Sequence, residues 1–191
     1  MRVSTKEIAV FGMLGAMMYA SKLIMEIAPN IHLIGVFVVA MTLVYKKKAL
    51  YPIYIFVIMT GLFSGFAMWW IPYLYIWAVL WAAVMLFPKK LKEMAANHGK
   101  GGFLTGKEIR KLSLVCMIIC SMHGFLYGIL YAPAQAIIFG LSFEGMIAWI
   151  VAGIPFDIVH GISNFFCGML IVPIVKVLNT AEKYTGRTDW N

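Results

Sequence analysis

Three polar side chains stand in an apolar stretch near the carboxyl end of the chain: Asp157, His160 and Asn164. Their spacings of three and four residues place them on one face if the stretch is helical. An acid, an imidazole and an amide can hydrogen-bond a ligand, exchange protons or contribute to a metal site. Polar groups in an apolar helix are costly unless they face a protein interior or a ligand. This face is therefore the first candidate for a functional site.

A second polar stripe lies earlier in the chain. His123, Tyr127, Tyr131 and Gln135 recur every four residues and share one helical face. We interpret the stripe as a cavity lining. The alternative is a hydrogen-bond network that only holds the helices together. Such bonds contribute about 1 kcal/mol or less each in membranes, which offsets little of the cost of burying an acid.

An aromatic stretch without charge occupies residues 66–77. Trp70, Tyr73 and Trp77 follow helical spacing within it, and Trp81 extends the same spacing beyond it. Two readings stay open. Trp and Tyr gather at membrane interfaces, and they also form walls against which a flat ligand ring can stack.

Composition identifies the environment of these residues. The chain is 62% hydrophobic and only 13% charged, whereas soluble domains average about 45–50% apolar and about 25% charged residues. Several apolar runs of 15 or more residues carry no charge. We therefore expect an all-α integral membrane protein, because lipid-exposed backbone must satisfy its own hydrogen bonds.

Six apolar stretches predict a single six-helix membrane domain over residues 1–191. The expected spans are about 8–28, 31–45, 49–66, 72–87, 108–139 and 146–178. The segment from residue 89 to 111 reads as the one properly polar loop.

Basic residues orient these spans. The net charge of +8 comes from Lys and Arg concentrated at the termini and in the second and fourth connections, Lys22 excepted. This alternation is a topology signal rather than a nucleic-acid site, and by the positive-inside rule it places both termini in the cytoplasm. The span at 108–139 then rises outward while the span at 146–178 descends. At 1.5 Å per residue, His160 and Asn164 reach the level of His123, so we expect one outward-opening cavity.

The first span carries a stripe of small residues, Gly12, Ala16 and Ala20, at four-residue spacing. Such stripes let another helix approach closely in lipid. Packing within the bundle and docking of a separate membrane partner both remain open.

Taken together, these features resemble a family. The chain resembles the substrate-binding membrane subunits (S components) of energy-coupling-factor vitamin transporters. The shared features are the size, the six helices, Ala16-Met-Met-Tyr-Ala20, and the pattern Pro155-Phe-Asp157 with His160 and Asn164. The folate- and pantothenate-type members have the most similar last helix. The resemblance covers the whole chain.

The resemblance implies a subunit in the plasma membrane of a prokaryote that captures a vitamin or related small nutrient. Its implied partners are a membrane coupling subunit, which docks on the Ala-x-x-x-Ala stripe, and two ABC-type ATPases. The chain itself then needs no cofactor, because the partner chains hydrolyse ATP. Substrate identity does not follow from the resemblance.

The residues add a little about the ligand. The aromatic residues suit a flat heteroaromatic ring, and Asp157 and Glu144 suit a hydrogen-bond donor edge. Lys22 is the single basic residue expected near the outer cavity, which argues against a strongly anionic ligand.

Two other functions compete with this reading. An intramembrane enzyme would use His123, His160 and Asp157 for acid–base or metal chemistry, but the sequence lacks the common catalytic motifs, and we expect neither catalysis nor a bound metal. A stand-alone secondary transporter is the second alternative, although such carriers often show internal repeats and none is visible between residues 1–90 and 91–191.

Overall fold

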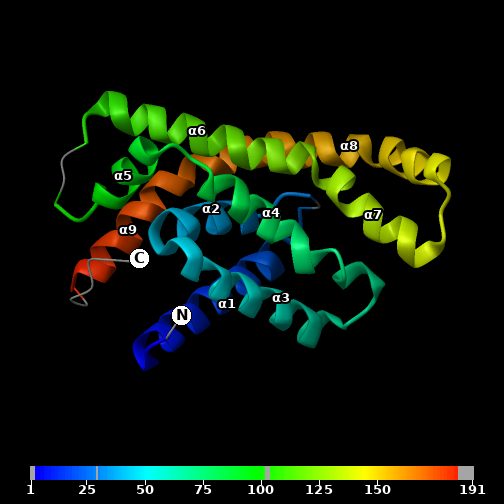
Figure 1. The fold of residues 1–191 in the computed structure, drawn as a ribbon, viewed down its shortest axis with the longest axis horizontal. Helices are drawn as coiled ribbons and strands as arrows, with labels where there is room; N and C mark the ends of the chain where they lie inside the picture. The colour runs from blue at the N-terminus through cyan, green and yellow to red at the C-terminus, as the bar shows by residue number, and fades with distance from the viewer. Residues whose placement is uncertain (1–2, 29, 102–103, 185–191) are drawn as a thin grey trace.

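The computed structural model describes residues 3–28, 30–101 and 104–184, and the regular elements within them are helices. The all-α prediction is confirmed. The α-helices are α1 (Thr5–Met25), α2 (Ile34–Tyr45), α3 (Leu50–Ser64), α4 (Tyr73–Met85), α5 (Lys89–Asn97), α6 (Gly106–Phe125), α7 (Tyr127–Phe139), α8 (Phe143–Cys167) and α9 (Ile171–Tyr184), joined in part by short 3-10 turns (Figure 1).

Four helical segments are long and apolar enough to cross a membrane. They are Thr5–Met25, Met68–Met85, Gly106–Phe139 and Phe143–Lys183. These segments support a multi-pass membrane protein. By contrast, α2 and α3 have 12 and 15 residues, fewer than the roughly 20 of a typical crossing.

The short helix α2 lies at the centre of the bundle. Every residue in it except Phe37 is buried, and it packs against α4, α5, α6 and α9. A helix that is hydrophobic all round belongs in a protein interior. Its run of Val, Ile and Leu therefore faces other helices rather than lipid.

The stretch expected as one span at 108–139 is two helices. α6 ends at Phe125 and α7 begins at Tyr127, with Leu126 between them at φ −92° and ψ 0°. The break leaves the Gly128 N–H to the Asp157 carboxylate, which accepts it at 3.1 Å. Gly106–Phe139 remains one long apolar segment, and a side chain of α8 satisfies the backbone at the break within it.

The last expected span, 146–178, is also divided. A 3-10 turn, Gly168–Leu170, separates α8 from α9. A Cβ at Gly168 would lie 2.8 Å from the Cα of Met117. The backbone of this turn therefore approaches the backbone of α6 closely.

The polar segment expected as a loop at 89–111 contains a helix, α5. Leu91, Met94 and Ala95 form its buried face, at the three- and four-residue spacing of an amphipathic helix. Asn179 of α9 donates to the carbonyls of Ala95 and His98, both at 2.8 Å. The loop prediction is therefore wrong for these nine residues.

Polar contacts stabilise the end of the bundle that carries Lys46, Lys47 and Lys48, which we call the lysine-rich end. Lys48 pairs with Glu7 at 2.5 Å, and the Tyr45 hydroxyl donates to Glu182 at 3.2 Å. The beginning of α1, the beginning of α6 and the end of α9 lie toward this same end, on the left in Figure 1.

The longest packing seam joins α6 to α8, which run side by side (Figure 1). A Cβ on Gly124 would lie 2.9 Å from the backbone of Gly161. The Ser121 hydroxyl donates to the Gly161 carbonyl at 2.8 Å, and the Asn164 amide donates to the Cys120 carbonyl at 3.3 Å. The expected adjacency of these two stripes is observed.

We expect Gly124→Ala to destabilise the protein by about 1–3 kcal/mol, because the added methyl group overpacks a backbone contact. Gly153→Ala is the matched control, since a Cβ there meets no atom within 4 Å; it should be neutral or stabilising by up to about 1 kcal/mol. Thermal unfolding in detergent measures both. Equal midpoints for the two variants would contradict the close seam.

Candidate ligand-binding site

Five aromatic side chains from five parts of the chain meet in the interior, and we call them the imidazole cluster: His32, Trp77, His123, Tyr127 and His160. Ring centroids are 4.4 Å apart for His32–His160 and 4.8 Å for Tyr127–His160. They are 5.6 Å apart for Trp77–His123 and 5.9 Å for His32–Trp77. Four members were predicted as site residues, and the fold brings them together.

His32 was not predicted as a site residue. It lies between α1 and α2, just ahead of Ile34, in the stretch expected as the second span. It has no partners at helical spacing, so periodicity could not find it. A histidine inside an apolar stretch was the one available signal.

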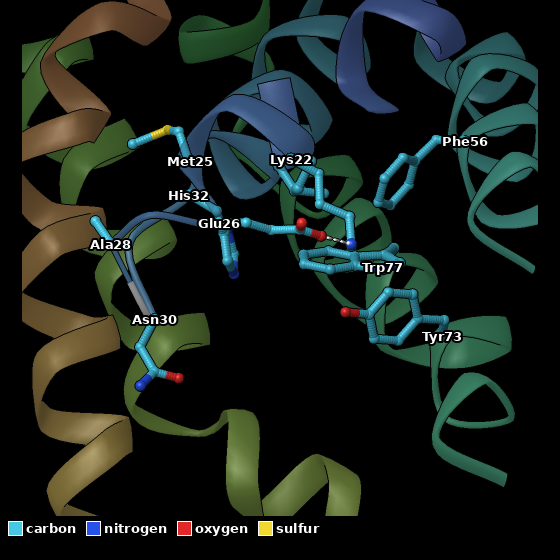
Figure 2. Close-up of a pocket in the computed structure, with 10 residues that line it drawn as sticks. Lys22, Met25, Glu26, Ala28, Asn30, His32, Phe56, Tyr73 and Trp77 are labelled. Carbon is cyan, nitrogen blue, oxygen red and sulfur yellow. Dashed lines mark hydrogen bonds and ion pairs between the residues drawn. The ribbon is translucent and has the colours of Figure 1, made fainter. Parts of the chain in front are cut away.

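A pocket of 210 Å³ opens beside the imidazole cluster. His32 and Trp77 line it together with Tyr73 of α4, Phe56 of α3 and the end of α1 (Figure 2). The α1 end contributes Lys22, Met25 and Glu26. The predicted residues Tyr73 and Trp77 therefore form a wall of this pocket.

The cluster also holds buried polar atoms without hydrogen-bond partners. Among the described residues these atoms are Nδ1 of His32 and His123, Nε2 of His160, Nε1 of Trp77 and Oδ1 of Asn164. Buried polar atoms normally have partners. All five belong to the imidazole cluster or to its neighbour Asn164. The unmet hydrogen-bonding capacity of the interior is thus concentrated at one place.

Other polar atoms of the cluster are already engaged. His123 Nε2 lies 3.1 Å from the Ile76 carbonyl, which fixes the ring against α4. Asn164 is fully buried and bonds α6 through its amide. In His123 and Asn164, one polar atom therefore stabilises the bundle. The other, His123 Nδ1 or Asn164 Oδ1, has no partner in the described structure.

Asp157 has a structural partner that spacing alone could not show. Both its carboxylate oxygens accept the Gly128 N–H at 3.1 Å, at the break between α6 and α7. Asp157 is not among the residues that line the pocket.

Of the predicted site residues, Tyr73 and Trp77 line the pocket, whereas the pocket lining does not include His123, Tyr127, His160, Asn164, Trp70, Tyr131 or Gln135. Trp70 donates from its indole to the Val57 carbonyl at 2.7 Å, which ties the turn before α4 to α3. Tyr131 donates to the Trp69 carbonyl at 2.5 Å. Gln135 is buried farther along α7. The second polar stripe therefore divides: His123 and Tyr127 enter the imidazole cluster, while Tyr131 and Gln135 lie beyond it.

Trp81, which continues the aromatic spacing of α4, is also separate from the cluster. Its indole donates to the Lys46 carbonyl at 3.0 Å, near the lysine-rich end. Trp77 and Trp81 lie on one helix, yet only Trp77 reaches the pocket.

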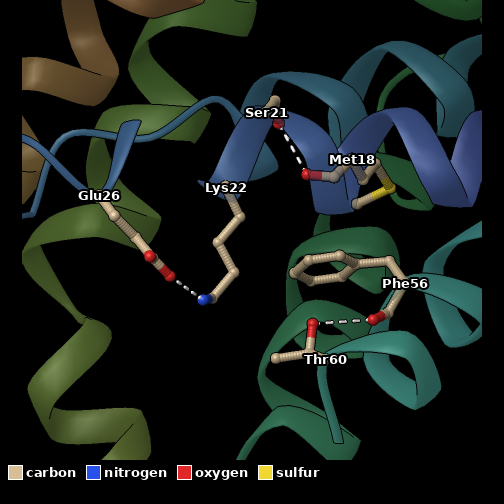
Figure 3. A network of polar contacts seen from close by, with 6 residues as sticks. All are labelled: Met18, Ser21, Lys22, Glu26, Phe56 and Thr60. Carbon is tan, nitrogen blue, oxygen red and sulfur yellow. Dashed lines mark hydrogen bonds and ion pairs between the residues drawn. The ribbon is translucent and has the colours of Figure 1, made fainter. Parts of the chain in front are cut away.

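Lys22 and Glu26 form an ion pair at the pocket, at 2.6 Å (Figure 3). The Lys22 side chain is 20% exposed and the Glu26 side chain 57% exposed. The nearby hydroxyls of Ser21 and Thr60 donate to carbonyls of their own helices, those of Met18 and Phe56. Lys22 and Glu26 are thus the charged groups available at this pocket.

The stripe of Gly12, Ala16 and Ala20 faces outward on α1. A Cβ on Gly12 meets no atom within 4 Å, and Ala20 is exposed. Instead, Gly15 receives α3: a Cβ there would lie 3.1 Å from the Pro52 carbonyl oxygen. Packing between α1 and α3 therefore uses Gly15, and the stripe is left on the bundle surface.

Comparison of the chain with protein-family models, curated proteins and solved structures finds no match. Within the part of the chain that the structure describes, no group of three His, Cys, Asp or Glu side chains could hold a metal ion.

We expect Asp157→Ala to lower the free energy of unfolding by about 1–3 kcal/mol, because it leaves the buried Gly128 N–H without its acceptor. Asp157→Asn keeps an acceptor oxygen and should recover most of this loss. Glu144→Gln on the exposed first turn of α8 is the control. Unfolding in detergent measures all three. An unchanged midpoint for the Ala variant would contradict the bridging role.

Proposed function

We propose that this chain is the substrate-binding membrane subunit of an ATP-driven importer, of the S-component type, for a vitamin or related small nutrient. The observation that carries the proposal is the pocket beside the imidazole cluster, because two residues that line it, His32 and Trp77, hold buried polar atoms without partners. Such a site, largely apolar with a few converging polar groups, is typical of small-molecule binding.

The proposal includes six membrane passes with both termini in the cytoplasm. The four long segments would supply four of the passes, and α2 and α3 would be the other two. All six would belong to one domain in a prokaryotic plasma membrane. The pocket would then face outward, since it lies at the end of α1 opposite Glu7 and Lys48.

Packing below the cluster favours a binding subunit over a self-contained carrier. Leu112, Cys116 and Cys120 of α6 are fully buried, and so are Ile171 and Val175 of α9. A ligand in the pocket would meet a closed core on its way to the cytoplasm. We infer that release requires the coupling subunit and the two ATPases, which leaves the stand-alone transporter as the second candidate.

The enzyme alternative has less support. The Asp157 carboxylate is occupied by the Gly128 N–H rather than by an imidazole, so an acid–base pair with His160 has no geometric basis. The site offers recognition groups instead: aromatic walls, buried hydrogen-bonding atoms and the Lys22–Glu26 ion pair.

We expect a small molecule to copurify with the protein and to be detected by native mass spectrometry in detergent. Trp77→Ala should lower its occupancy about tenfold or more, because a stacking wall contributes on the order of 1 kcal/mol beyond its buried area. Trp81→Ala is the matched control, as its indole faces Lys46. Absence of any bound molecule in the parent protein, or equal loss in both variants, would count against the proposal.

Ala16→Trp should leave ligand occupancy unchanged and abolish uptake by cells that also contain the coupling module, because a bulky side chain blocks close helix approach. Ala152→Trp, at an exposed alanine of α8, is the control and should retain uptake. Normal uptake by Ala16→Trp would show that the stripe is not the docking face.

A further inference from the structure

The polar groups that line the pocket differ from those expected at the outset. A donor edge on the ligand was expected to meet Asp157 and Glu144, but neither residue lines the pocket. Asp157 lies at the helix break, and Glu144 is exposed at the first turn of α8. The charged groups at the pocket are Lys22 and Glu26 instead.

Lys22 is the more buried partner of this pair, and Glu26 the more exposed. Exposed ion pairs contribute only about 0–1 kcal/mol. Another anion can therefore displace Glu26 from Lys22 with little loss of free energy. A ligand that covers the ammonium group also removes its water, which requires a new negative partner. Lys22 thus favours a ligand with one acidic group.

Trp77 sets a second requirement. Its Nε1–H can only donate, and in the described structure it is buried without an acceptor. The Nδ1 atom of His32, which also lines the pocket, is likewise unpartnered. A ligand that satisfies the Trp77 N–H presents a hydrogen-bond acceptor, such as a ring nitrogen, and His32 Nδ1 can donate to a ligand or accept from it according to its tautomer.

Size and shape set the third requirement. The pocket volume of 210 Å³ is below the roughly 300–1,000 Å³ of drug-sized sites. Phe56, Tyr73 and Trp77 provide aromatic surfaces for stacking. The volume fits one ring with a short substituent.

We infer that the pocket selects a monocyclic heteroaromatic carboxylic acid, with its carboxylate at Lys22 and a ring nitrogen toward Trp77. This inference rests on the proposed function, since it names the class of ligand that the same site takes. The matched probes are pyrazine-2-carboxylate, its carboxamide, and benzoate, which keeps the acid and lacks the ring nitrogens.

Binding of each probe is measured by thermal shift and isothermal titration on the detergent-purified protein after bound molecules are washed out. We expect the pyrazine acid to bind about tenfold or more tighter than its amide and than benzoate. Lys22→Met should remove the preference for acid over amide and leave the preference for a ring nitrogen. Glu26→Gln should tighten binding of the acid. Lys89→Met, at a fully separate exposed lysine, should change nothing.

Equal binding of acid and amide, failure of the acid to bind, or a preference that survives Lys22→Met would overturn the inference. The proposed function is judged separately by copurification and uptake. A neutral copurified molecule would overturn the acid at Lys22 while the importer function stands. Absence of any bound molecule would count against the function itself.

Discussion

The close approach of α6 and α8 is the contact on which the rest of this structure depends. Lipid provides no hydrophobic drive between helices, so the helices associate through packing and hydrogen bonds. Gly124 and Gly161 let the two backbones meet, and Ser121 and Asn164 bond across the seam. This contact fixes the depth of His123 on α6 relative to His160 on α8, and both rings contact Tyr127.

The same contact explains why the site lies beside a break in a helix. Where α6 ends, its neighbour Asp157 takes up the Gly128 N–H, and α7 leaves in a new direction (Figure 1). Tyr127 at the beginning of α7 thereby reaches His160, with ring centroids 4.8 Å apart. The Asp157 carboxylate thus bonds the backbone, and the rings of Tyr127 and His160 meet in the imidazole cluster beside the pocket.

Periodicity predicted much of this arrangement. The apolar runs marked where helices form, and four-residue spacing identified His123, Tyr127, His160 and Asn164 as one meeting point. Residues without such spacing were missed, as with His32 in its short connection. The helix α5 was missed because its charged residues outnumber its buried ones. Trp77 and Trp81 could not be distinguished, because spacing assigns a helix face but not the neighbour that covers it.

The sequence by itself determined the helical class, the membrane environment and the two polar stripes, because these follow from local hydropathy and a fixed helical period. Only the tertiary structure decided which members of each stripe enter the imidazole cluster, which backbone group Asp157 satisfies, and that Gly15 rather than Gly12 receives α3. These outcomes depend on how far helices slide and tilt against one another. That choice is made by contacts between residues distant in the chain, which no local pattern encodes.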